Sequence, residues 1–129
     1  MKNERRRKRS EMVQEAASLY LEAVIERNRI KAMALASDEG LLVAGAGDGY
    51  DHEWLAALGV VTGEPHFDGM IAEITRGEGM VSFDVPVHGR TLRLSAVGKS
   101  PPSLEDASAA LSRIFAPLFG ASTPVVATS

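Results

Sequence analysis

Residues Ala32 to Ala46 read AMALASDEGLLVAGA and carry the clearest structural signal in the chain. Two short apolar runs, 30 to 36 and 41 to 46, flank the triplet Asp38-Glu39-Gly40, and an acid-glycine turn between apolar runs is typical of a β-hairpin. The first run alternates alanines with larger residues and is apolar on both faces. It therefore predicts a central strand that helices can approach closely on its small-residue side.

Amphipathic segments lie on both sides of this hairpin. Before it, polar residues three and four apart between Glu11 and Arg29 predict a helix, with Ser10 as its N-cap. After it, Asp51 can cap a second helix that extends to about Val61. Near the end of the chain, Ser103 and Asp106 form a capping box ahead of an apolar stripe that runs to Leu118, which predicts a last helix.

Three further strands are expected between the second helix and the last one. They cover Met70 to Arg76, Met80 to Val87 and Thr91 to Val97, with glycine-containing turns between them. The expected order is helix, two strands, helix, three strands, helix. Antiparallel hairpins with segregated helices predict an α+β fold, in which one five-stranded antiparallel sheet carries three helices.

Composition limits the classes of protein to which the chain can belong. Its 129 residues, 45% of them apolar, suit one domain, which we expect over residues 10 to 118. Cysteine is absent, which excludes disulfides, thiolate zinc sites and a cysteine nucleophile. No apolar run approaches a membrane span, and the start fits neither a secretory nor a transit peptide. We therefore expect a cytoplasmic protein.

Charge is distributed unevenly along the chain. Residues 1 to 9 carry six basic side chains against Glu4 alone, a balance of +5, whereas the whole chain carries −3 and the remaining residues therefore −8. We expect a disordered basic arm over residues 1 to 9 and a disordered tail over residues 119 to 129. The arm could attract nucleic acid or an anionic membrane, or it could act as a solubilising segment or contact the acidic domain. Its cations closest to the domain are Arg5, Arg6, Arg7, Lys8 and Arg9.

The element order resembles that of the roadblock/dynein light chain family. The likeness covers Ile30 to Phe115: residues 32 to 46 resemble the family's first hairpin, Trp54 to Leu58 its short central helix, and residues 91 to 115 its final strand and helix. The resemblance implies a homodimer or heterodimer in which the central helices pack together and the third strands pair. It also implies a regulatory or scaffolding role, in bacteria often toward Ras-like small GTPases. Two features depart from the family pattern: Pro86 in an expected interior strand, and the arginine-rich start.

The expected central helix argues for a partner without any reference to a family. No charged residue occurs between Trp54 and Val61, so roughly half of the helix surface would be exposed apolar area in a monomer. Such a surface usually marks an interaction site, although the loop from Thr62 to Gly69 could instead fold over it. The expected partner-facing residues lie on this helix and on the strand after it: Trp54, Leu55, Leu58, Val61, Met70, Ala72 and Ile74.

No set of residues in the sequence predicts catalysis, a metal site or a bound cofactor. Gly45, Gly47 and Gly49 lack the third glycine of the dinucleotide fingerprint and the lysine of the P-loop. The cluster after them fits neither an EF-hand nor a zincin and is explained by helix capping: Asp48, Asp51, His52 and Glu53. The other two histidines, His66 and His88, are isolated in expected loops, and no serine lies in a nucleophile elbow. We therefore expect a protein that is not an enzyme.

Three hypotheses about function follow from the sequence. The leading one is a dimeric protein-interaction module that serves as a regulator or scaffold. The second is a small-ligand-sensing, profilin-like domain, with the ligand between the loop from Thr62 to Gly69 and the sheet. The third is an adaptor that binds nucleic acid or membrane through the basic arm.

Overall fold

The computed structural model describes residues 2 to 98 and 103 to 119, with side chains from Lys8 onward. It has the expected α+β class. The elements, in order, are α1 (Lys2–Asn28), β1 (Ala32–Ser37), β2 (Leu42–Ala46), α2 (His52–Gly59), the short 3-10 helix η1 (Pro65–Phe67), α3 (Asp68–Ile74), β3 (Met80–Val87), β4 (Arg90–Val97) and α4 (Leu104–Phe119).

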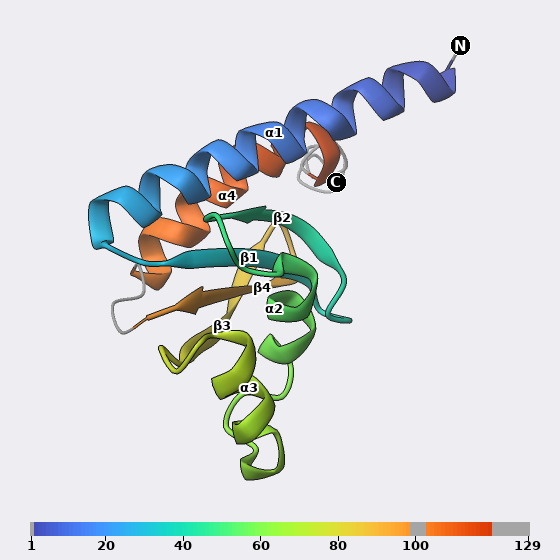
Figure 1. The fold of residues 1–129 in the computed structure, drawn as a ribbon. Helices are drawn as coiled ribbons and strands as arrows, with labels where there is room; N and C mark the ends of the chain where they lie inside the picture. The colour runs from blue at the N-terminus through green and yellow to red at the C-terminus, as the bar shows by residue number, and fades with distance from the viewer. Residues whose placement is uncertain (1, 99–102, 120–129) are drawn as a thin grey trace.

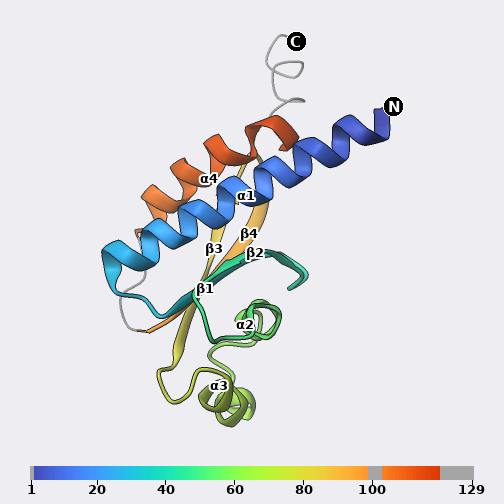
Figure 2. The same cartoon turned by 45° about the horizontal axis from the view of Figure 1, so that its top comes forward.

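One antiparallel sheet with the strand order β2-β1-β4-β3 separates two helical layers. Helices α1 and α4 cover one face, and α2 covers the other (Figures 1 and 2). Strand β1 pairs on both sides, and Leu35 lies opposite Ala44 of β2 and Leu94 of β4. The first strand is therefore central, as its sequence predicts.

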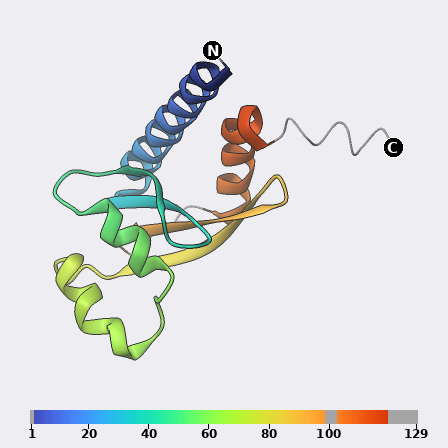
Figure 3. The ribbon, with the colours of Figure 1, turned by 90° about the vertical axis from the view of Figure 1, so that its right-hand side faces the viewer.

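The alternation within β1 sorts its residues between the two layers. Met33 and Leu35 pack into the larger core with α1 and α4. Ala32, Ala34 and Ala36 face the other way and pack against Leu55 and Ala56 of α2. Because alanine side chains are short, α2 lies close to the sheet, where Figure 3 shows it crossing the strands. The small-residue side of the hairpin thus receives a helix, as expected.

The expected strand from Met70 to Arg76 is absent, because most of these residues form α3. The sheet consequently has four strands rather than five, and the described residues contain four α-helices rather than three. The buried residues of this segment, Ile71 and Thr75, lie four positions apart, which is helical spacing. Methionine, alanine and glutamate also favour a helix over a strand. At every other element the observed order is the one that the roadblock resemblance implies.

The first helix begins earlier than expected. It includes residues 2 to 9, so Ser10 is not an N-cap and the basic arm is helical where we expected disorder. Arginine and lysine are good helix formers, and Glu4 precedes Lys8 by one turn, a favourable spacing for opposite charges. Phe119, the first residue of the expected disordered tail, is still part of α4, and the rest of that tail lies outside the described residues.

The two sheet edges differ in how they are covered. Helix α1 packs along β2, and Gln14 Nε2 donates a hydrogen bond to the Val43 carbonyl at 3.0 Å. The β1–β2 register also shifts between Leu35 and Ala36, next to Val43 in the paired strand. A helix and an irregular register both discourage a further strand from pairing with β2.

We predict that Gly47→Ala destabilises the fold more than Gly63→Ala. Both glycines have positive φ angles, +99° and +92°, so both substitutions carry left-handed strain of about 1–2 kcal/mol. A Cβ on Gly47 would also lie 2.5 Å from the Lys31 carbonyl oxygen, whereas a Cβ on Gly63 meets nothing within 4 Å. Crowding should cost Gly47→Ala about a further 1–3 kcal/mol. Urea unfolding of the two variants measures the difference, and equal losses would contradict the close approach.

Candidate protein interaction surface

The start of α2 is fixed by hydrogen bonds to the loop that precedes it. The Asp51 carboxylate accepts a bond from the Trp54 backbone N–H at 3.2 Å, which makes Asp51 the N-cap that the sequence predicts. One turn away, His52 Nε2 lies 2.8 Å from the Gly47 carbonyl oxygen. Asp51 and His52 therefore fix the first turn of α2. The backbone that carries Trp54 belongs to this fixed turn.

The end of α2 is held to the sheet. The Gly59 carbonyl accepts bonds from Arg93 Nη1 at 3.3 Å and from Thr62 Oγ1 at 3.1 Å. A Cβ on Gly59 would come within 2.3 Å of Ser95 Oγ, so only glycine fits this contact without a shift. Arg93 Nη2 also pairs with Asp84 Oδ1 of β3 at 2.9 Å. Arg93 thus joins the end of α2 to both β4 and β3.

This fixed helix leaves some apolar side chains in solvent and buries others. Trp54 is 46% exposed and Val60 42% exposed, whereas Val61 is half-buried. Leu55 and Leu58 are 0% and 2% exposed, so the expectation that a partner covers these two leucines has to be corrected. Their side of α2 rests on the alanine face of the sheet, and they belong to the core of the subunit. Val60, which the sequence reasoning omitted, is part of the exposed surface instead.

The loop expected from Thr62 to Gly69 does not cover this surface. Its residues include η1 and the start of α3, and they turn away from the sheet beneath α2 (Figure 1). On α3, Met70 is 42% exposed and Ala72 is also exposed, while Ile74 is half-buried. The three residues expected on a strand are therefore on a short helix beside α2. We name Trp54, Val60, Val61, Met70, Ala72 and Ile74 the α2–α3 surface.

Strand β3 adds an open edge near this surface. Among the strands of the described residues it pairs with β4 alone, and the Gly98 N–H donates to the Gly79 carbonyl at 3.2 Å. Hydrogen-bonded and non-bonded pairs alternate in an antiparallel ladder, so from this bond the backbone groups of Met80, Ser82 and Asp84 point away from β4. Unpaired N–H and C=O groups on an edge are a template for another strand.

Pro86 sets the limit of that open edge. We expected it to interrupt an interior strand, but β3 is an edge strand. By the same alternation, the nitrogen of Pro86 faces outward, so its missing N–H removes no bond to β4. Its carbonyl accepts a 2.7 Å bond from Ser108 Oγ of α4. The edge is therefore available at Met80, Ser82 and Asp84 and closed at Pro86.

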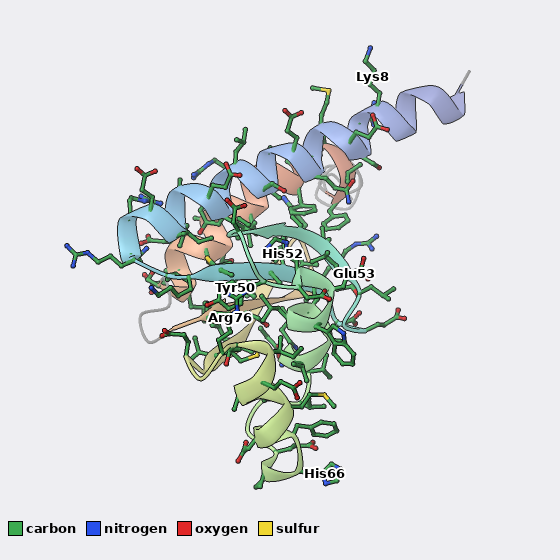
Figure 4. The ribbon with its side chains drawn as sticks, viewed as in Figure 1. Lys8, Tyr50, His52, Glu53, His66 and Arg76 are labelled. Atoms are coloured by element: carbon green, nitrogen blue, oxygen red, sulfur yellow. The ribbon has the colours of Figure 1, made fainter. Side chains whose placement is uncertain are left out.

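The loop with Gly45, Gly47 and Gly49 has a structural role. Arg76 donates a hydrogen bond to the Gly49 carbonyl, and its guanidinium carbon lies 4.9 Å from the centre of the Tyr50 ring (Figure 4). Since His52 contacts the Gly47 carbonyl, two carbonyls of the loop are used within the subunit. These contacts attach the end of α3 to the entry of α2.

His88, His66 and Tyr20 each contact or are buried by other residues of the subunit. His88 and Gly89 form the β3–β4 turn with φ angles of 50° and 76°, and His88 Nε2 lies 2.6 Å from the Ser112 carbonyl oxygen. His66 stacks edge-on against Phe67 (Figure 4). Burial raises the pKa of the Tyr20 hydroxyl, which lies on α1. No group of three His, Asp or Glu side chains in the described part of the chain is placed to hold a metal.

The basic arm is remote from the α2–α3 surface. Residues 2 to 9 form the first turns of α1, which extend past the sheet on its opposite face (Figures 1 and 4). Lys8 and Arg9 are exposed there, and Arg5, Arg6 and Arg7 belong to the same helical turns. Within residues 2–98 and 103–119, none of the helices combines the length and the apolar character that crossing a bilayer requires.

Comparisons with known proteins give structural likenesses but no match by sequence. No protein-family model matches the chain, and no curated protein sequence matches it. The structure is similar to that of MglB from Myxococcus xanthus, with 17% sequence identity and a TM-score of 0.49 over 84% of this chain and 91% of that one. At this level the likeness identifies neither a partner nor an activity.

We predict that proline is tolerated at Ser82 and not at its neighbour Val81. The Val81 N–H faces β4, so Val81→Pro removes a ladder bond and leaves an acceptor unpaired, at a cost of about 1–3 kcal/mol. The Ser82 N–H faces solvent, so Ser82→Pro should cost less, although it loses the weak 3.3 Å bond from Ser95 Oγ. Thermal unfolding followed by circular dichroism compares the two variants. A larger loss for Ser82→Pro would mean that the assigned edge is wrong.

Proposed function

We propose that this protein is a non-catalytic interaction module that dimerises and acts as a regulator or scaffold. The observation that carries the proposal is Trp54, the only tryptophan of the chain, which is 46% exposed on a helix anchored at both ends. Tryptophan is enriched among the residues that dominate protein interfaces. An anchored, half-exposed tryptophan can enter an interface with little loss of conformational entropy.

The surroundings of Trp54 favour a protein partner. Val60 and Met70 are each 42% exposed, at the C-cap of the same helix and on the neighbouring α3. Fully burying such a side chain contributes about 1.5–3 kcal/mol, so covering what remains exposed of three of them contributes a few kcal/mol. Exposed apolar surface of this kind usually marks an interaction site. The nearby edge of β3 supplies directional hydrogen bonds that apolar contact lacks.

A second copy of the chain can satisfy both features at once. Two copies related by a two-fold axis would place α2 against α2 and align the two β3 edges antiparallel near Ser82, which makes one continuous sheet. The roadblock resemblance implies this kind of dimer, through pairing of the third strands. In this chain the strand that can pair is β3 rather than the segment from Met70 to Ile74. A heterodimer with a related chain would use the same elements.

The partner of the dimer is inferred from the resemblance. Roadblock-type proteins in bacteria often serve Ras-like small GTPases, and we propose a GTPase or a multiprotein complex as the target. His52 and His88 each contact a backbone carbonyl within the subunit, which favours structural roles for these two rings. The alternative of a small-ligand sensor needs space between the loop from Thr62 to Gly69 and the sheet, but in the described part of the chain it is α2 that packs on the alanines of β1.

We predict a dimer in solution that Trp54→Glu disrupts. Placing a charge in the α2–α3 surface should cost at least the contribution of the buried tryptophan, about 1.5–3 kcal/mol, and should weaken dimerisation more than about tenfold. Sedimentation velocity over a concentration series measures the dissociation constant. Because Trp54 is the sole tryptophan, its emission should also shift to shorter wavelength as concentration rises.

Leu19→Glu provides the control for this experiment. Leu19 is 59% exposed, but it lies on α1, which covers the opposite face of the sheet from the α2–α3 surface, so its variant should dimerise normally. Ser82→Pro should weaken the dimer without unfolding the subunit, since it blocks the open edge. A wild-type chain that stays monomeric at tens of micromolar, with unchanged tryptophan emission, would refute the dimer.

We predict that the dimer binds a small GTPase in a nucleotide-dependent way. Ras-like GTPases from the source organism, loaded with GDP or with a non-hydrolysable GTP analogue, can be passed over immobilised protein in surface plasmon resonance. We expect one of them to bind at least about tenfold more tightly in one nucleotide state. Trp54→Glu should reduce this binding, and Leu19→Glu should not. If no GTPase binds while the dimer stays intact, the proposed GTPase partner is refuted and the proposed scaffolding role remains.

A further inference from the structure

A second apolar surface lies on the opposite side of the molecule, where α1 crosses the end of α4. A groove with a volume of about 520 Å³ runs between the two helices. We name it the α1–α4 groove, and its main lining residues are Lys8, Arg9, Met12, Ala16, Ile114 and Pro117. The α2–α3 surface is on the other face of the sheet, so the proposed dimer leaves this groove free.

The groove exposes apolar side chains. Met12 is 64% exposed, and Ile114 is only half-buried. Pro117, near the end of α4, is also exposed. Methionine adapts its shape to a partner and is frequent at binding surfaces that accept helices. Two helices forming the walls of an apolar groove give the geometry into which a third, amphipathic helix packs.

The rim of the groove is cationic. Lys8 and Arg9 line it, and no acidic residue does. In the sequence, Arg5, Arg6 and Arg7 come directly before Lys8, so the basic residues continue toward the start of α1. These first turns extend past α4 (Figure 2), and residues 2 to 9 alone span about 12 Å of helix. A projecting cationic helix next to an apolar groove calls for a ligand that is apolar on one side and negatively charged on the other.

We propose that the α1–α4 groove binds an acidic amphipathic helix of another protein. Its apolar side chains pack on Met12, Ile114 and Pro117, and its carboxylates meet Lys8 and Arg9. This site is independent of the dimer, so one molecule can join a second copy on one face and a different protein on the other. The basic arm is then part of a binding site rather than a solubilising segment.

Two other occupants match these features less well. An anionic membrane would meet Glu11 and Glu15, exposed on α1 next to the cationic turns, and a concave groove does not suit a flat lipid surface. The segment from Gly120 to Ser129 contains no acidic side chain, so it does not complement the charge of the rim. An acidic helix satisfies both the shape and the charge.

The experiment uses the methionines of the chain as reporters in methyl NMR. Met12 lies in the groove, Met33 is buried in the core, Met70 lies on α3 and Met80 on β3. The probe is a synthetic peptide of about five helical turns, with leucines on one face and glutamates elsewhere. We expect it to shift the Met12 signal and leave the other three unchanged. A matched peptide with lysines in place of the glutamates should bind at least about tenfold more weakly.

Variants test the site itself. Met12→Glu, Lys8→Glu and Arg9→Glu should each weaken binding of the acidic peptide about tenfold or more, and added salt should weaken binding to the wild type. Leu104→Glu is the control, because Leu104 is a 48% exposed apolar residue on α4 that does not line the groove. This variant should bind like the wild type.

Four outcomes would overturn the proposal. The first is equal binding of the acidic and basic peptides, and the second is a shift at Met70 or Met80 instead of Met12. The third is Met12-dependent binding to phosphatidylserine-containing vesicles without binding of the peptide, which would assign the surface to lipid. The fourth is a Met12 shift that depends on the concentration of the protein alone, which would assign the groove to a second copy.

Discussion

The burial of β1 on both faces is the constraint on which the rest of the structure depends. Ala32, Met33, Ala34, Leu35 and Ala36 are all fully buried. A strand in this position needs a strand on each side and a helical layer on each face, and the chain provides all four. Met33 and Leu35 project into the layer of α1 and α4, and the alanines project into the layer of α2. The first layer is therefore thick and the second is thin.

The thin layer explains the character of the α2–α3 surface. Helix α2 has no charged residue from Trp54 onward, and a thicker layer would have room to enclose more of it. Packed on alanines and held at Gly59 by Arg93, the helix buries Leu55 and Leu58 and turns Trp54 and Val60 outward. The exposed apolar side chains are therefore a product of core packing. Strand β3 is the last strand of the sheet on this side. Its open edge therefore lies near the exposed side chains of α2.

Much of this could be predicted from the sequence, and the failures have physical causes. Apolar alternation and acid-glycine or His-Gly turns located both hairpins, because these signals are local. The segment from Met70 to Ile74 is too short for periodicity to distinguish a helix from a strand. It forms a helix that buries Ile71, and this burial depends on tertiary packing. Burial of Leu55 and Leu58 depends on how close α2 lies to the sheet, a tertiary distance that no local pattern contains. The α1–α4 groove was missed because its walls are about a hundred positions apart in the sequence.

The unequal edges of the sheet bear on how far an assembly can grow. A sheet with two open edges can add copies without end and form fibres, whereas one open edge allows a single pairing event that uses it up. Here α1 and the Gln14 bond to Val43 occupy the β2 side, and Pro86 with Ser108 shortens the free stretch of β3. Under the proposed pairing of β3 edges, growth by strand addition would therefore stop at two subunits, and a larger complex would have to use the helices.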